Sequence, residues 1–159
     1  MGRSDESKLY LVVEAGITLA VVEMLLAYGA VAAVLIAPDG APLDAARTKP
    51  IVDLVQAGGV AALIEDDAGL ARTLRADGVH LPWSRDVVSR YGAAREILGG
   101  RFIVGADAGR LRDDAMMLGE AGADYVGFGI PGHVEDRQTA RERSGDLPLF
   151  WPVPQIPVS

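Results

Sequence analysis

The sequence contains no cysteine among its 159 residues. Disulfides, thiolate metal sites and cysteine nucleophiles are therefore excluded for these residues, and a reducing, cytoplasmic location is expected. Apolar runs of membrane-spanning length are also missing, and the first eight residues are polar and mixed in charge. We therefore expect neither a membrane segment nor a signal peptide.

Positive charge is scarce as well. Fifteen Lys and Arg residues stand against 22 Asp and Glu residues, which gives a formal net charge of −7. Because an acidic chain repels nucleic acid and anionic membranes, neither is an expected partner. Half of the residues are apolar, and the length suits one domain with a real core.

A repeated pattern organises the chain. A helical segment ends, a small residue and an Asp form a turn, and a short apolar strand follows. The two clear copies lie at residues 76–81 (ADGVHL) and 122–129 (GADYVGFG), and looser copies precede residues 31–36 and 60–64. Strands that alternate with helices in this way predict successive βα units and a parallel sheet, with functional residues at the carboxyl ends of the strands.

Six strands and five helices are expected up to residue 128, and a further charged helix is expected at residues 135–143. The strands are residues 9–13, 31–36, 60–64, 79–81, 102–104 and 125–128, and the helices are residues 17–26, 43–56, 68–74, 86–98 and 111–120. Pro50 predicts a kink or a break in the second helix. Two architectures fit this order, an open doubly wound sheet and a (β/α)8 barrel that lacks its last two βα units.

The expected domain organisation is simple. Residues 1–8 are predicted to form a disordered tail, and residues 9–143 a single partial barrel. The last segment, residues 144–159, is predicted to be extended, because a high density of proline forbids both a helix and a central strand. Its prolines include Pro148, Pro152, Pro154 and Pro157.

The chain resembles the thiamine-phosphate synthase family, which also includes the TenI-type thiazole tautomerases. The residues that carry the resemblance are 9–12 (LYLV), 76–81 and 121–129. The resemblance implies a (β/α)8 barrel and a transferase of thiamine biosynthesis. It also implies a small phosphorylated heterocycle as ligand and Mg²⁺ as cofactor, because a diphosphate leaving group needs its charge stabilised.

The family pattern transfers to this chain only in part. Asp66 matches a metal-binding Asp, and Asp86 matches a second one after a one-residue slip. The family places cations after the second strand, where this chain has Ala37-Pro38-Asp39. The resemblance therefore implies a degenerate active site with Asp66 and Asp86 as metal ligands. The implied substrate-binding positions are Glu65, His80, Asp107, Gly127, Gly129 and Arg137.

Most of these candidates also have a purely structural explanation. Asp66 or Asp67 can cap the helix that follows, since acids complement the helix dipole. His80 is expected to form a hydrogen bond inside the barrel, and Asp107 to cap the next helix. Arg137 is expected on the solvated face of a charged helix.

The repeated Asp residues and an aromatic loop residue complete the candidates. Asp77 and Asp124 are expected to form turns. Trp83 has two possible roles, in the wall of a pocket or as a cover for the barrel mouth.

Three functions stay open at this point. The first is a thiamine-phosphate synthase-like transferase, and the second is a non-catalytic or repurposed binder of a small ligand. The third is a partial barrel that assembles with a partner chain. Because six strands of eight leave two unprotected sheet edges, a homo-oligomer is expected.

Overall fold

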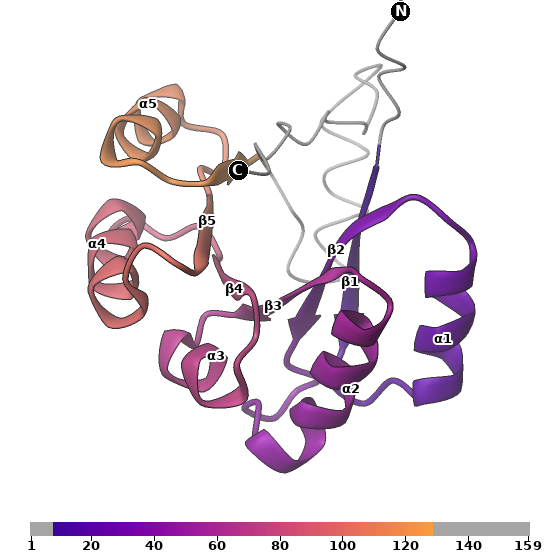
Figure 1. Cartoon of the computed structure of the whole chain (residues 1–159). Helices are drawn as coiled ribbons and strands as arrows, with labels where there is room; N and C mark the ends of the chain where they lie inside the picture. The colour runs from indigo at the N-terminus through magenta and orange to yellow at the C-terminus, as the bar shows by residue number, and fades with distance from the viewer. Residues whose placement is uncertain (1–7, 129–159) are drawn as a thin grey trace, which may run out of the picture.

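The computed structural model describes residues 8–128, and the predictions for the tails and for residues 129–143 lie outside this range. The described chain is a curved parallel sheet whose helices follow one another around the convex side (Figure 1). Within the described range, no helix is long and apolar enough to cross a membrane.

Strands and helices alternate without exception along the described chain. The strands are β1 (Leu9–Glu14), β2 (Val31–Ala37), β3 (Ala61–Glu65), β4 (Gly78–Leu81), β5 (Ile103–Asp107) and β6 (Tyr125–Gly127). The helices are α1 (Leu19–Ala27), α2 (Ala45–Ala57), α3 (Ala68–Leu74), α4 (Val87–Leu98) and α5 (Arg112–Ala121). All eleven elements expected up to residue 128 are therefore present, with bounds that differ by a few residues at most.

The strand order decides between the two architectures that the sequence left open. The sheet order is β1-β2-β3-β4-β5-β6, and every neighbouring pair is parallel. An open doubly wound sheet would reverse its order at a switch point, whereas right-handed crossovers in one direction build a barrel. The sequential order confirms the partial (β/α)8 barrel.

Aliphatic side chains form the layer between the sheet and the helices. Strand residues such as Ile64 and Val104 are fully buried there, against helix residues such as Val52 and Leu118. Both faces of each strand are covered near the middle of the sheet, which explains why the strands are apolar runs and not alternating ones.

The repeated Asp turn has the same geometry in both clear copies. The Asp77 carboxylate accepts a hydrogen bond of 2.8 Å from the backbone N–H of Ala62, and that of Asp124 accepts one of 2.8 Å from Val104. Each Asp therefore fixes its turn to the start of the preceding strand. The prediction that both residues are turn formers is confirmed.

A helix residue supports each of these carboxylates. Gln56 of α2 donates to Asp77 at 3.2 Å, and Arg95 of α4 donates to Asp124 at 2.7 Å. Both copies of the turn thus have an Asp that accepts a hydrogen bond from the side chain of a helix residue. That residue is the neutral Gln56 in the first copy and the charged Arg95 in the second.

The second helix is continuous, so of the two outcomes expected at Pro50, a kink or a break, the break is wrong. Residues 45–57 form one helix that contains Pro50. A proline inside a helix removes one backbone hydrogen bond, but Ile51, Val52 and Val55 bury the helix against the sheet. Because helices in proteins are stabilised mainly by packing of their apolar face, this packing offsets the lost bond.

Candidate functional site at the carboxyl ends of the strands

Several candidates named from the sequence gather at the carboxyl ends of the strands. Glu65 ends β3, Asp107 ends β5 and Gly127 ends β6. Asp107 is in register with Gly127, and Glu65 is in register with His80 of β4. The sheet therefore brings these four positions to one end of the barrel, which we call the mouth.

Asp107 is held in the mouth by the loop that follows it. Its side chain is 4% exposed, and one carboxylate oxygen accepts a hydrogen bond of 2.6 Å from the backbone N–H of Gly109. The expectation that Asp107 caps the next helix is wrong, because the N-cap residue of α5 is Leu111. The turn at Gly109, which has a φ of 59°, keeps the carboxylate at the sheet instead.

The indole of Trp83 covers the same loop. A Cβ placed on Gly109 would lie 2.9 Å from the ring, so the ring rests directly on the glycine. Its Nε1 donates a hydrogen bond of 3.1 Å to Asp114 of α5, while 43% of the residue stays exposed. Trp83 is therefore a fixed and exposed aromatic surface at the mouth, beside the loop that holds Asp107.

The two candidate metal ligands contact a network that contains a cation. Asp66 forms an ion pair with Arg90 of α4. Arg90 also donates to the hydroxyl of Ser84 at 3.0 Å, and that hydroxyl donates to Asp86 at 2.8 Å. Both carboxylates are thus linked to a guanidinium group that belongs to the chain itself.

A second ion pair at the mouth lies where the resemblance implies cations in the loop after β2. Arg47, near the start of α2, forms hydrogen bonds of 2.5 and 3.4 Å with Asp39 in the loop after β2. The hydrogen bond from Arg47 lowers the pKa of the Asp39 carboxyl. The loop sequence lacks a cation, but the helix that follows supplies one.

Sequence reasoning missed both of these arginines. Arg90 stands four residues after Asp86, and Arg47 stands eight residues after Asp39. The available signal was a basic residue in the first turn of α2 and of α4. Such a residue lies over the mouth because helices in this fold begin where strands end.

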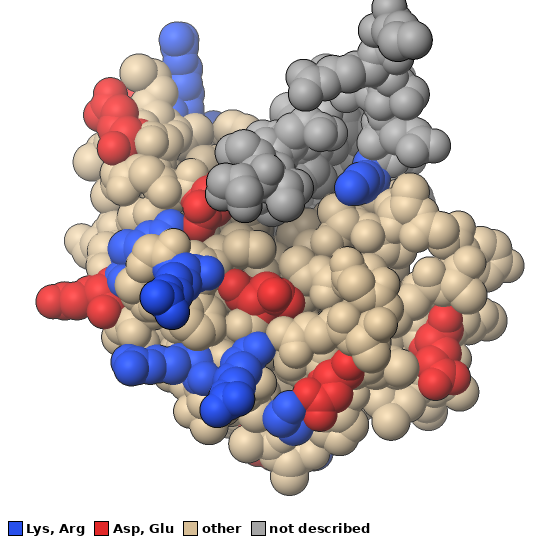
Figure 2. Space-filling model, viewed as in Figure 1, with Lys and Arg blue, Asp and Glu red and all other residues tan. Residues whose placement is uncertain are grey.

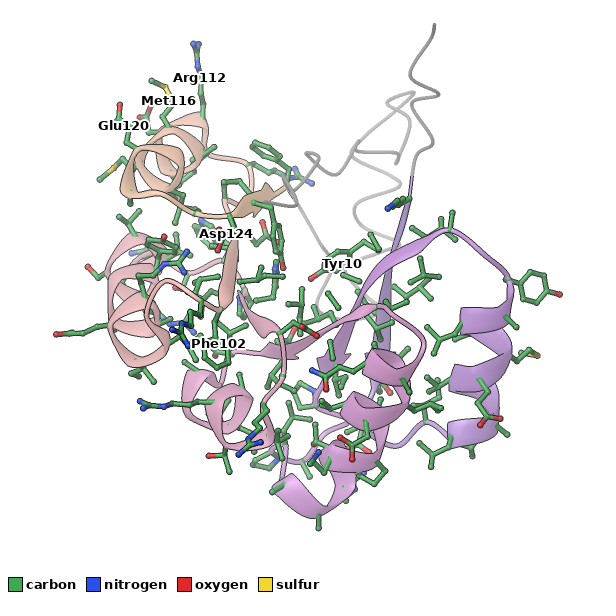
Figure 3. The ribbon with its side chains drawn as sticks, in the orientation of Figure 1. Tyr10, Phe102, Arg112, Met116, Glu120 and Asp124 are labelled. Atoms are coloured by element: carbon green, nitrogen blue, oxygen red, sulfur yellow. The ribbon has the colours of Figure 1, made fainter. Side chains whose placement is uncertain are left out.

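Inside the barrel, His80 belongs to a chain of hydrogen bonds that joins three strands. Its Nδ1 lies 2.8 Å from the hydroxyl of Tyr125 in β6, and that hydroxyl lies 2.8 Å from the hydroxyl of Tyr10 in β1. Figure 3 shows Tyr10 reaching from β1 toward the far side of the sheet. The expectation that His80 is hydrogen-bonded in the interior is confirmed.

Burial sets the protonation states of this chain. It lowers the pKa of His80 to about 4. It raises the pKa of the Tyr10 and Tyr125 phenols above their usual range. All three groups are therefore neutral at pH 7, and His80 is a hydrogen-bonding group there and not a cation.

A glycine makes room for the second tyrosine. Gly105 of β5 is in register with Tyr125, and a Cβ built on Gly105 would lie 2.0 Å from the tyrosine ring. The ring stacks against His80 with centroids 5.7 Å apart. The two tyrosines were missed as candidates, although they stand on the same inward face of their strands as His80.

The described residues do not fit a bound Mg²⁺ ion well. Hard cations take clusters of carboxylate and carbonyl oxygens. No group of three or more acidic or histidine side chains within residues 8–128 is arranged to hold a metal. Mg²⁺ at Asp66 and Asp86 stays a prediction, and so does the binding role of the other candidates. Gly129 and Arg137 lie outside the described residues.

Comparison with known proteins assigns the family. The family model described as thiamine monophosphate synthase, TMP-TENI, matches residues 9–141. This chain belongs to the thiamine monophosphate synthase family. The resemblance inferred from residues 9–12, 76–81 and 121–129 is thereby confirmed.

Two curated relatives show how much of a family member this sequence spans. A thiamine-phosphate synthase from Hyphomonas neptunium is 48% identical over 79 residues, which are 50% of this chain and 34% of that protein. One from Erythrobacter litoralis is 36% identical over 111 residues, which are 68% of this chain and 51% of that protein. The chain therefore spans about half the length or less of these relatives.

A solved family structure supports the fold. The thiamine phosphate pyrophosphorylase from Pyrococcus furiosus superposes with a TM-score of 0.62 at 25% sequence identity. The match covers 79% of this chain and 61% of that one. The described half-barrel thus corresponds to part of a thiamine monophosphate synthase barrel.

Proposed function

We propose that this chain is a thiamine-phosphate synthase-like protein of thiamine biosynthesis with a degenerate active site. Its mouth binds a small phosphorylated heterocycle, and the chain alone joins the pyrimidine diphosphate to the thiazole phosphate slowly at best. Family membership supports the type of ligand, and the charge arrangement of the mouth supports the low rate.

The pairing of Arg47 with Asp39 and of Arg90 with Asp66 is the observation that carries this proposal. The reaction must stabilise the negative charge of a departing diphosphate. A guanidinium that already faces a carboxylate has most of its charge compensated. Each lost charge-assisted contact removes about 2–4 kcal/mol of transition-state stabilisation, so two lost contacts reduce the rate by at least about 10³-fold.

Binding is supported by groups that stay accessible at the mouth. Arg85 and Arg110 are exposed in the loops after β4 and β5, where they are available to a phosphate group. The exposed ring of Trp83 offers an aromatic surface to a heterocycle. These features favour a binder with weak turnover over a protein without any ligand.

The test separates binding from turnover. Trp83 reports ligand at the mouth by fluorescence once the other tryptophan is removed in a Trp151→Phe variant. We expect saturable quenching by thiazole phosphate or by pyrimidine diphosphate. We also expect thiamine phosphate formation at least about 10³-fold slower than that of the Hyphomonas neptunium thiamine-phosphate synthase measured in parallel.

Two results would contradict the proposal. Turnover similar to that of the relative would show that the arginine pairs do not weaken catalysis. No quenching by either compound, with the Trp151→Phe variant folded by circular dichroism, would show that the mouth does not bind them. A Trp83→Phe variant, which keeps a ring at the mouth, serves as the matched control for the signal.

The ends of the sheet favour a second candidate, a partial barrel that assembles with another chain. Among the described strands, β1 pairs only with β2 and β6 only with β5. Leu9 and Val12 of β1 are 46% and 40% exposed. Exposed apolar edge strands pair readily with other chains, which supports the prediction of a homo-oligomer.

Light scattering tests this candidate. We expect the average mass to rise with concentration near ten micromolar, and a Val12→Lys variant to lower that rise, because a lysine on an edge strand opposes pairing. A monodisperse monomer at higher concentration would refute self-association. Mixing the chain with a longer relative distinguishes pairing with itself from pairing with a complete barrel.

A further inference from the structure

The guanidinium group of Arg90 has three acceptors at the mouth. It forms an ion pair with Asp66 and donates to the hydroxyl of Ser84 at 3.0 Å and to the carbonyl of Pro82 at 3.5 Å. These acceptors come from the loop after β3 and from the loop after β4. One cation therefore joins two loops that neighbouring strands present side by side.

The backbone directs Asp66 toward this cation. Asp66 has a φ of 55°, in the left-handed region that residues other than glycine seldom adopt. Its backbone N–H donates to the carbonyl of His80 at 2.9 Å, which fastens the loop to β4. The neighbouring Asp67 caps α3 by accepting a hydrogen bond of 2.8 Å from the backbone N–H of Leu70. Because Asp67 is the cap, the side chain of Asp66 pairs with Arg90 instead.

The second carboxylate reaches the same group through a hydroxyl. Ser84 accepts from Arg90 and donates to Asp86 at 2.8 Å. Asp86 is the N-cap residue of α4, but its side chain makes no capping hydrogen bond. The carboxylate is therefore turned toward Ser84 and not toward its own helix.

Two carboxylates, a hydroxyl and a carbonyl oxygen are the ligand types that a hard divalent cation prefers. Here the positive charge among them is the Arg90 guanidinium, which is attached to α4. We propose that Arg90 is a built-in cation that fills a latent divalent-metal site formed by Asp66 and Asp86, so that the native chain keeps its mouth assembled without Mg²⁺. Removal of the guanidinium then opens the site to a metal ion.

The ion pair of Arg90 differs from a simple surface ion pair in how many acceptors the guanidinium contacts and in how many loops they come from. The side chain of Arg90 is 28% exposed and that of Asp66 is 47% exposed, and the guanidinium has a fixed set of acceptors from two loops. The exposed pair of Lys49 and Asp53 lies within one helix and involves no other loop. Arg90 thus holds an arrangement of oxygens together, as a bound metal ion does.

Metal binding by an Arg90→Ala variant tests the inference. Mn²⁺ replaces Mg²⁺ as the probe because its free form is counted directly by electron paramagnetic resonance. We expect at least tenfold tighter Mn²⁺ binding by Arg90→Ala than by the native chain, at one site per chain. The gain disappears in the double variants Asp66→Asn/Arg90→Ala and Asp86→Asn/Arg90→Ala.

The control variants distinguish the general effect of removing a positive charge from the opening of the site at Asp66 and Asp86. Arg72→Ala removes the same charge from α3, where Arg72 donates to a backbone carbonyl, and it should bind Mn²⁺ as weakly as the native chain. Arg90→Lys keeps a cation and should also gain nothing. Arg90→Gln, which keeps most of the stem, replaces Arg90→Ala if circular dichroism shows that the latter is unfolded.

The outcomes are decisive either way. Equal Mn²⁺ affinity of the native chain and the Arg90 variants would overturn the inference, and so would a gain that survives the Asp66→Asn change. The inference does not rest on the proposed function, because no thiamine precursor enters the measurement. Failure to bind such a precursor therefore leaves it unaffected.

Discussion

The convex face of the sheet packs against the helices through aliphatic side chains such as Ile64 and Val79, whereas the concave face carries Tyr10, His80 and Tyr125. Burial stabilises the first face, and burial is not directional. Hydrogen bonds with fixed partners organise the second, and a missing partner there leaves a buried polar group unpaired. The convex face should therefore respond to volume, and the concave face to single hydroxyl groups and to pH.

The solvent-facing sides of the helices also differ, in how many charged and how many apolar residues they carry. Figure 2 shows several charged side chains over α3 and α4 and few over α1. Among the exposed residues of α1 and its cap are Leu19, Met24 and Tyr28. At the other end of the sheet, Arg112, Met116 and Glu120 point outward from α5 (Figure 3). Of the first and the last described helix, α1 therefore has the more apolar solvent-facing side.

The largest effect is expected from a cavity in the convex layer. Ile64→Ala, at a position with no exposed surface, should reduce the free energy of unfolding by about 3–4 kcal/mol through lost burial and a residual cavity. Urea denaturation at pH 7.5 measures it. The control is Ile97→Ala, a 46% exposed position on α4, with an expected cost of about 0.5 kcal/mol or less. Similar costs for both would show that the layer is not tightly packed.

The next largest effect is a pH dependence that arises from the concave face. Burial lowers the pKa of His80 to about 4, so the folded state binds fewer protons than the unfolded state between pH 4 and about 6.5. The stability contributed by neutral His80 is complete above about pH 6.5 and is lost as the pH falls toward 4, by about 3 kcal/mol in total.

Urea denaturation across this pH range, with a His80→Gln variant, checks that effect. The variant should show a flatter dependence between pH 4.5 and 6.5, whatever its stability at pH 7.5. A His133→Gln variant changes the only other histidine of the chain and should keep the native slope. A slope that stays the same in His80→Gln would assign the dependence to other groups.

A smaller effect is expected from one hydroxyl in the middle of the concave network. Tyr125→Phe removes a group that is hydrogen-bonded to both His80 and Tyr10. The loss should be about 2 kcal/mol, because the buried His80 and the partly buried Tyr10 both lose their partner while the ring stays in place. Tyr28→Phe, at a position that is 83% exposed, should change the stability by about 0.5 kcal/mol or less. Equal effects would remove the proposed difference between the two faces.

The smallest effect is expected at the end of the network. Tyr10→Phe removes one hydrogen bond from a residue that is only partly buried, and it leaves the bond between Tyr125 and His80 intact. We expect a loss of about 1 kcal/mol. Amide hydrogen exchange should show the loss first in β1, since Tyr10 joins β1 to the far side of the sheet. A loss of stability larger than that of Tyr125→Phe would show that Tyr10, and not Tyr125, is the more important hydroxyl of the network.

The sequence predicted the elements well because their signals are local. The Asp turns at Asp77 and Asp124, the apolar strands and the glycines that end helices all act within a few residues. The exception was Pro50, whose local signal predicted a kink or a break, whereas packing of Ile51 and Val55 keeps the helix continuous. Sequential strand order followed from the same local units, because short right-handed crossovers place successive strands side by side.

The candidate site was predicted less completely. The residues at strand ends, Glu65, His80 and Asp107, lie at the mouth as expected. The cations that pair with Asp39 and Asp66 were not predicted, because Arg47 and Arg90 come from helices that start after the loops in question. The sequence showed an acidic mouth without cations, and the structure shows acids that are paired.

The sequence by itself determined the alternation of strand and helix, the covered convex face and the positions that the mouth offers. It did so because hydrophobic period and turn chemistry are properties of neighbouring residues. Only the tertiary structure decided which polar groups meet there. Tyr10 and Tyr125 are 115 residues apart, and Asp66 meets Arg90 from another βα unit. Such contacts depend on the curvature and register of the whole sheet, which no local stretch of sequence specifies.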